Sequence, residues 1–167
     1  LVNAIDFFRS TPVQPYPHNT TCAGTYPTVV TAFNPDHAFP DRNRLGIAGH
    51  SLGGIGVSVV QSYGATGADP WPGEIDTQNP VKAVVAWDGI FTQASGSTGN
   101  AGGNTTQAGD ASVPLVVPQF PILGLNGEYG LSPQPFTAPP NPNKLLTNFG
   151  VWQNAGVPVV ELTIQGS

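Results

Sequence analysis

The sequence has 167 residues, the length of a single domain, and its formal net charge is −5 with only 9% of its residues charged. So few Lys and Arg residues argue against nucleic acid and anionic membrane surfaces as partners, and no segment approaches the roughly 20 apolar residues of a membrane-spanning helix. Hydrophobic residues make up 39% of a chain that also holds 21 Gly and 18 Pro, which predicts a folded but loop-rich domain.

The N-terminal part is expected to form a short helix followed by a long irregular connection. Apolar side chains recur at helical spacing over residues 1–8, whereas residues 10–40 are rich in Pro, Thr and Asn. This connection holds Cys22, which is either a free buried thiol or half of a disulfide with a segment outside this sequence. The low charge and the abundance of Asn, Thr, Gly and Pro are typical of secreted proteins, which favours the disulfide and an extracellular location.

The most informative segment is the sequence Gly-His-Ser-Leu-Gly-Gly at 49–54. It lies between an apolar run and a segment suited to a helix, which is the context of the G-x-S-x-G nucleophile elbow, where a serine occupies a sharp turn. A side chain at Gly49 or Gly53 is expected to clash with the neighbouring strand or helix. Ser51 is thereby raised above the edge of the sheet, and the backbone N–H of Leu52 points at charge that develops on an attacked carbonyl.

The rest of the chain alternates apolar runs with loops. A second apolar run, Val81–Asp88, follows the elbow after about 30 residues, the spacing of a β-α-β unit. The low-complexity residues 92–112 are expected to form a surface loop. In chain order, the expected elements are a helix at 1–8, a strand at 44–49, a helix at 52–64, strands at 81–87 and 120–125, a helix at 143–155 and a strand at 157–164.

Strands that alternate with helices predict an α/β fold, a mainly parallel sheet flanked by helices. In such sheets the functional residues follow the carboxyl ends of the strands. The side chains in that position are Ser51, Asp88 and Glu128.

These segments together resemble strands five to eight of the α/β-hydrolase fold in its serine-esterase branch. The branch includes secreted bacterial cutinase-like and lipase-like polyester hydrolases and dienelactone-hydrolase relatives. The resemblance spans nearly the whole chain, and the elbow is its most specific motif. It is carried by Arg44–Gly54, Val84–Asp88, Pro121–Glu128 and Val159–Gly166.

The resemblance implies a triad in the order serine, acid, histidine. Ser51 matches the nucleophile. In the cutinase-like branch the acid is an Asp two residues beyond a Glu; here the Glu matches Glu128, but Gly130 stands at the Asp position. The acid is therefore either Glu128, which we favour, or Asp88 after the preceding strand.

The resemblance places the catalytic histidine in the turn after the last strand, about two residues beyond Ser167. His18 and His37 precede the serine, contrary to the family order. His50, inside the elbow, is expected to point away from the nucleophile and to line the substrate site. The resemblance implies the same substrate-lining role for Trp87, and we expect Tyr129, beside Glu128, to line the same cleft.

The fold also needs earlier strands and a second oxyanion-hole loop. Residues 1–167 are therefore expected to be one hydrolase domain that lacks these strands and the histidine-bearing segment, completed by another chain or by a missing segment. Four strands without their neighbours would expose a sheet edge and an apolar face.

The predicted function is hydrolysis of carboxylic esters through an acyl-enzyme on Ser51, with little or no turnover by the isolated chain. No metal or cofactor is expected, because no His, Cys and Asp residues cluster at ligand spacing. The alternatives are a non-catalytic homologue with a binding or structural role, and a peptidase, amidase or acyltransferase on the same fold.

Overall fold

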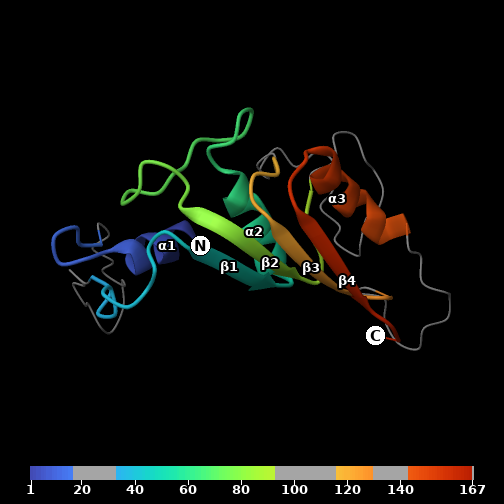
Figure 1. Cartoon of the computed structure of the whole chain (residues 1–167), viewed down its shortest axis with the longest axis horizontal. Coiled ribbons are helices and arrows are strands. Elements are labelled where there is room, and N and C mark those ends of the chain that lie inside the picture. The colour runs from blue at the N-terminus through green and yellow to red at the C-terminus, as the bar shows by residue number, and fades with distance from the viewer. Residues whose placement is uncertain (17–32, 93–115, 130–142, 167) are drawn as a thin grey trace, which may run out of the picture.

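The computed structural model describes residues 1–16, 33–92, 116–129 and 143–166. Its sheet has four strands in the order β1-β2-β3-β4, and every neighbouring pair is parallel (Figure 1). The expected α/β fold is thus confirmed, and each expected element is present to within two residues at either end. The elements are α1 (Val2–Arg9), β1 (Leu45–His50), α2 (Leu52–Ser62), β2 (Val81–Trp87), β3 (Ile122–Gly127), α3 (Asn143–Asn154) and β4 (Val159–Ile164).

One face of the sheet packs against helices α2 and α3 to form the core. Helix α2 lies behind β1 and β2 in Figure 1 and contacts both strands. Its Val57 is completely buried, and Trp152 of α3 is buried in the same cluster. The strands supply β-branched side chains such as Val84, which suit a pleated, half-buried surface.

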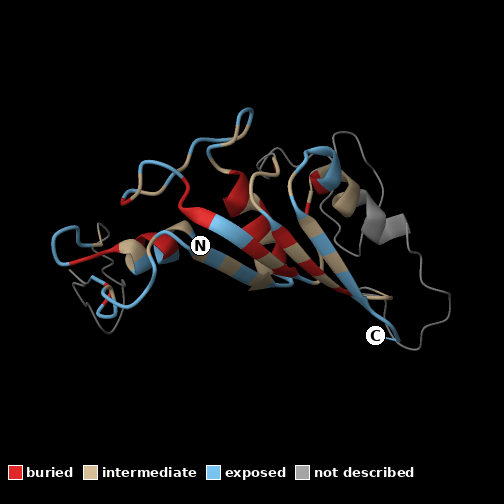
Figure 2. Cartoon of the chain, viewed as in Figure 1, coloured by how far each residue is buried: buried red, intermediate tan, exposed pale blue. Residues whose placement is uncertain are grey.

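The other face of the sheet carries half-exposed apolar side chains. Trp87 and Leu162 lie in one register row across the strands, and Val160 and Ile164 share their face because side chains alternate along a strand. These four side chains are 52%, 52%, 55% and 52% exposed, respectively. Exposed positions of β4 are visible along its length in Figure 2. The described helices with the most contacts to the strands, α2 and α3, pack on the opposite face of the sheet.

The remaining expectations about the chain are met only in part. None of the described helices combines the length and the apolar character that crossing a bilayer requires. Of the long connection at 10–40, the described ends form turns, including a short bridge between Thr11 and Gln14. Cys22, His18 and most of the loop expected at 92–112 lie outside the described residues.

Candidate active site

Ser51 stands on a strained turn between β1 and α2. Its backbone has φ 56° and ψ −119°, a combination that side-chain-bearing residues rarely adopt and that costs about 1–3 kcal/mol. The turn is held by hydrogen bonds on both sides. The N–H of Ser51 donates to the Trp87 carbonyl at 3.1 Å, and the Ser51 carbonyl accepts from the Gly54 N–H at 2.8 Å. The serine side chain is therefore presented at the exposed carboxyl edge of the sheet.

The glycines around the serine allow the helix to approach the sheet. A Cβ on Gly49 would lie 2.0 Å from the Gly53 carbonyl oxygen, so no side chain fits there, as expected. The same expectation for Gly53 is wrong, because a Cβ on Gly53 meets nothing within 4 Å. The requirement falls instead on Gly54, whose Cβ would lie 2.9 Å from the Trp87 carbonyl oxygen. The carbonyl of Gly53 lies close to Gly49 of β1, whereas the Cα of Gly53 faces open space.

The first turn of α2 begins with Leu52, the residue expected to donate to an oxyanion. Leu52 is the first helical residue, and its N–H has no acceptor one turn earlier in the helix. Ser51, the N-cap residue, makes no side-chain capping bond. The Leu52 side chain is 78% exposed. This N–H and the positive end of the helix dipole are therefore free to act on an anion beside Ser51.

Asp88 and His50 contact each other beside the serine. The Nε2 atom of His50 lies 3.0 Å from Oδ2 of Asp88, and the His50 ring meets the Trp87 ring edge-to-face at 5.7 Å. Asp88 also has a positive φ of 69°. The sequence did not predict this pair, because it depends on the register between β1 and β2. His50 is paired in register with Trp87, so the residue that follows Trp87 emerges next to it.

Glu128 connects the turns that follow β3 and β4. Its N–H donates to the Ile164 carbonyl at 3.0 Å, and its Oε2 accepts from the Gly166 N–H at 2.9 Å. Ser51, Asp88 and Glu128 therefore all leave the sheet at its carboxyl edge, as the parallel topology predicted. The structure brings Glu128 to the turn after β4 and Asp88 to His50.

Glu161 is a titratable group that the sequence reasoning missed. Its carboxylate lies on the helix-covered face of β4 and accepts a hydrogen bond from the amide of Asn126, which is 4% exposed. Burial raises the pKa of Glu161 to about 7, against the lowering effect of the Asn126 hydrogen bond. The available signal was a charged residue inside the apolar run 159–164.

The remaining histidine of the described residues stays apart from this group. The His37 ring packs edge-to-face on Phe33 at 5.5 Å, and its Nδ1 lies 3.1 Å from the Asn34 carbonyl oxygen. Tyr129 follows Glu128 at the same edge of the sheet. Among the described residues, no group of three or more His, Cys, Asp or Glu side chains is arranged to hold a metal ion.

Comparison with models of known protein families, with curated proteins and with solved structures finds no match. Functional inference therefore rests on the geometry around Ser51.

Proposed function

We propose that this chain is the nucleophile-bearing part of a serine hydrolase of the α/β-hydrolase type that acts on carboxylic esters. One observation carries the proposal: Ser51 has a strained backbone with positive φ at the tip of a strand-turn-helix. A non-glycine residue in such a conformation is uncommon and is concentrated at functional sites, where the surrounding structure holds the strain. In an ordinary Gly-rich turn, a glycine would be expected to take the positive φ in place of the serine.

The reaction proceeds by acyl transfer in two steps. Ser51 Oγ attacks the ester carbonyl while a histidine takes its proton, and the tetrahedral intermediate collapses when that proton passes to the departing alcohol oxygen. Water then attacks the acyl-enzyme by the same route in reverse, releasing the carboxylic acid and restoring the serine. The Leu52 N–H stabilises the oxyanion in both steps, and a donor of this kind contributes about 3 kcal/mol.

Glu128 is the better candidate for the acid that orients the histidine. Its carboxylate reaches the turn after β4, where it accepts from the Gly166 N–H. The family resemblance expects the histidine next to this turn. Asp88 is already paired with His50, so it would have to exchange that partner. The base itself must come from outside the described residues.

The exposed apolar groups around Ser51 favour a substrate with a hydrophobic acyl or alcohol part. Leu52 and Trp87 are 78% and 52% exposed at the edge where the ester would bind, and His50 packs against the Trp87 ring. Tyr129 lies beside Glu128 and would contribute from the next strand end. We also propose that the protein is extracellular and that another segment or chain covers the open face of the sheet.

A fluorophosphonate probe tests the proposal directly. In the full-length natural protein the probe is expected to label Ser51, and Ser51→Ala should lose the label and lose hydrolysis of short p-nitrophenyl esters while keeping its unfolding midpoint. The 167-residue chain alone should show little or no turnover. An intact protein whose serine resists the probe, or whose ester turnover survives Ser51→Ala, would exclude this function.

A non-catalytic role is the second candidate, and one observation favours it. Both candidate acids are engaged by groups other than a catalytic histidine, Asp88 by His50 and Glu128 by the Gly166 N–H. A homologue that only binds a partner would leave the fluorophosphonate unreacted. If the probe reacts, amide substrates and acyl acceptors tested beside the esters separate an esterase from a peptidase, amidase or acyltransferase.

A further inference from the structure

A small polar pocket lies at the opposite end of the sheet from Ser51. It has a volume of about 220 Å³ and is built where β1 and β2 begin. The six residues of β1 separate it from the serine by about 20 Å, given the rise of a strand. Its lining comprises Arg9, Arg42, Asn43, the segment 76–80 and Lys82.

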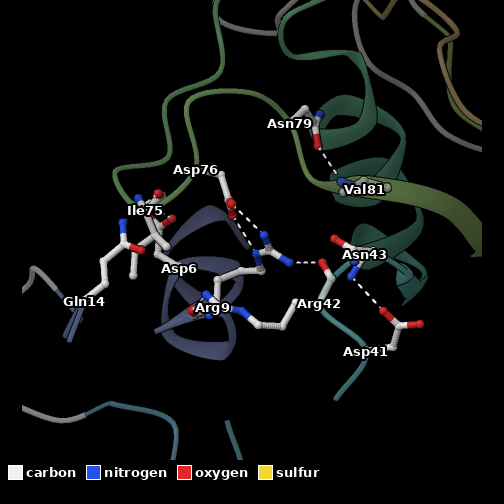
Figure 3. Close-up of polar contacts among 10 residues, drawn as sticks. All are labelled: Asp6, Arg9, Gln14, Asp41, Arg42, Asn43, Ile75, Asp76, Asn79 and Val81. Atoms are coloured by element: carbon white, nitrogen blue, oxygen red, sulfur yellow. Dashed lines mark hydrogen bonds and ion pairs between the residues drawn. The ribbon is translucent and has the colours of Figure 1, made fainter. Parts of the chain in front are cut away.

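The frame of this pocket is held by Arg9 at the end of α1. Its guanidinium donates from Nε and Nη2 to the two carboxylate oxygens of Asp76, each at 2.7 Å, and from Nη1 to the Arg42 carbonyl (Figure 3). The Arg9 and Asp76 side chains are 15% and 19% exposed. These bonds of the Arg9 guanidinium, the Arg9 fork, join α1 to the segments that lead into β1 and β2. The pocket is therefore formed before any ligand binds.

Further hydrogen bonds fix the segment that leads into β2. The Asp6 carboxylate accepts from the backbone N–H groups of Glu74 and Ile75, and the Gln14 amide donates to the Ile75 carbonyl at 2.9 Å. Asn79, at the far end of the segment, accepts from the Val81 N–H at 3.1 Å. Figure 3 shows these side chains around the Arg9 fork. A wall fixed at both ends does not have to be ordered by a ligand.

Two cations of the pocket remain without a carboxylate partner. Arg42 donates one hydrogen bond, from Nη2 to the Arg9 carbonyl, and within the described chain no acid pairs with its guanidinium. Lys82 is exposed, and its Nζ lies 5.9 Å from the centre of the Phe120 ring. Asp76 is the one acid among the described residues of the lining, and Arg9 already neutralises it.

This charge distribution is unusual for the chain. The protein has five Lys and Arg residues in total and a net charge of −5, yet three of the five line this one pocket. With Asp76 offset by Arg9, an excess of two positive charges remains. The side chains of Asn43, Thr77 and Gln78 add uncharged hydrogen-bonding groups to the lining.

We propose that this pocket binds a small doubly charged oxyanion. Arg42 presents a planar guanidinium that matches the oxygens of a carboxylate or phosphate, and Lys82 adds a second positive charge to the lining. The volume suits an inorganic phosphate or a short dicarboxylate. The site is independent of ester hydrolysis, because it lies at the amino ends of the strands rather than at the carboxyl edge.

Calorimetric titration of the whole chain tests this site. Inorganic phosphate and succinate are titrated separately, with the ionic strength held constant by sodium chloride. At least one is expected to bind saturably at one site per chain, and the anion that binds identifies the ligand as a phosphate or a dicarboxylate. Arg42→Gln and Lys82→Gln should each weaken binding by about tenfold, the usual loss for one charge-assisted hydrogen bond.

Arg44→Gln is the matched control, since Arg44 is 86% exposed on the segment beside Arg42 but does not line the pocket. Its affinity should equal that of the unaltered chain. Absence of saturable binding by both anions would overturn the proposal, as would equal weakening by Arg44→Gln, which would indicate unspecific attraction by surface charge. Lys82→Gln keeps the test decisive if Arg42→Gln impairs folding, because Lys82 is exposed. When the same substitutions are made in the full-length natural protein, labelling of Ser51 by the fluorophosphonate should be the same in all variants.

Discussion

Ser51 and its neighbouring glycines show how single residues set the candidate active site. The serine has positive φ, and the glycines on either side differ in what they must accommodate. A Cβ at Gly49 would clash with the carbonyl of Gly53, and a Cβ at Gly54 would clash with the carbonyl of Trp87. The three neighbouring glycines therefore differ in whether a side chain fits at their position. The pattern G-x-S-x-G alone does not show this difference.

Gly49→Ala and Gly53→Ala should consequently have opposite outcomes. A Cβ at position 49 would meet a backbone oxygen at 2.0 Å, which forces strand and helix apart and lowers the free energy of unfolding by about 3 kcal/mol or more. At position 53 the methyl group meets open space, and alanine in a helix should raise stability by up to about 1 kcal/mol. Urea unfolding of both variants checks this. Equal destabilisation of the two would contradict the assigned roles.

Glu161 predicts a pH dependence of stability at the residue scale. Burial raises its pKa in the folded chain from 4.5 to about 7, so the folded state holds a proton that the unfolded state releases. The resulting stabilisation is fully present below pH 4.5 and is lost as the pH rises through about 7. Glu161→Gln removes this ionisation and keeps an oxygen for the Asn126 amide.

The variant should therefore gain stability relative to the unaltered chain as the pH rises from 4.5 to above about 7. Chemical unfolding followed across this range measures the difference. Asp69→Asn, at an exposed position, removes the same charge and serves as the control. If both variants change the pH dependence of the unfolding free energy equally, the effect comes from net charge rather than from burial.

At the scale of elements, the C-terminal end of α2 is closed by amide side chains from other segments. The helix has no basic residue in its last turn. Asn79 donates to the carbonyls of Val60 at 2.8 Å and Tyr63 at 3.1 Å, and Gln119 donates to the Ser62 carbonyl at 2.9 Å. These bonds add side-chain donors to carbonyls at the end of the helix, and they join α2 to the segments before β2 and β3.

Asn79→Ala should destabilise the chain by about 1–3 kcal/mol, because it removes the acceptor of the buried Val81 N–H and the side-chain donor of the Val60 carbonyl. The same change at Asn154, an exposed position at the end of α3, should have an effect below about 0.5 kcal/mol. Urea unfolding monitored by circular dichroism compares the two. If Asn79→Ala leaves the free energy of unfolding unchanged, water replaces the hydrogen bonds that Asn79 makes.

At the scale of the whole molecule, the sheet is covered on one face and open on the other. The covered face holds the core cluster, whereas Trp87, Val160, Leu162 and Ile164 remain half-exposed on the open face. Such a contiguous apolar surface is uncommon on a monomer and marks a surface that other apolar groups can bind.

The chain should therefore bind the hydrophobic dye anilinonaphthalene sulfonate in its native state. A Val160→Thr, Leu162→Thr double variant should reduce the dye fluorescence while leaving the strand intact, since Thr is also suited to strands. Val13→Thr changes an apolar residue that is 95% exposed and lies outside the sheet, so it should leave the fluorescence unaltered. Dye binding that the double variant does not change would place the bound surface elsewhere.

The fold could be predicted from the sequence because its signals are local. Apolar runs and intervening loops fix strands and helices by period and length, and the sequence at 49–54 fixes the turn. Parallel strands in turn bring Ser51, Asp88 and Glu128 to one edge. The local pattern failed at Gly53, because the direction in which a Cα hydrogen points depends on how the helix lies against the sheet.

The sequence alone thus determined the α/β class, the order of the elements along the chain and the serine on its turn. Only the tertiary structure decided that His50 pairs with Asp88, that Glu161 is half-buried beside Asn126, and that Arg9, 67 residues from Asp76, organises a cationic pocket. Such contacts depend on strand register and on loss of solvent at positions far apart in the chain. Strand register and loss of solvent are not encoded by the residue types of one segment. These contacts therefore cannot be predicted from local sequence patterns.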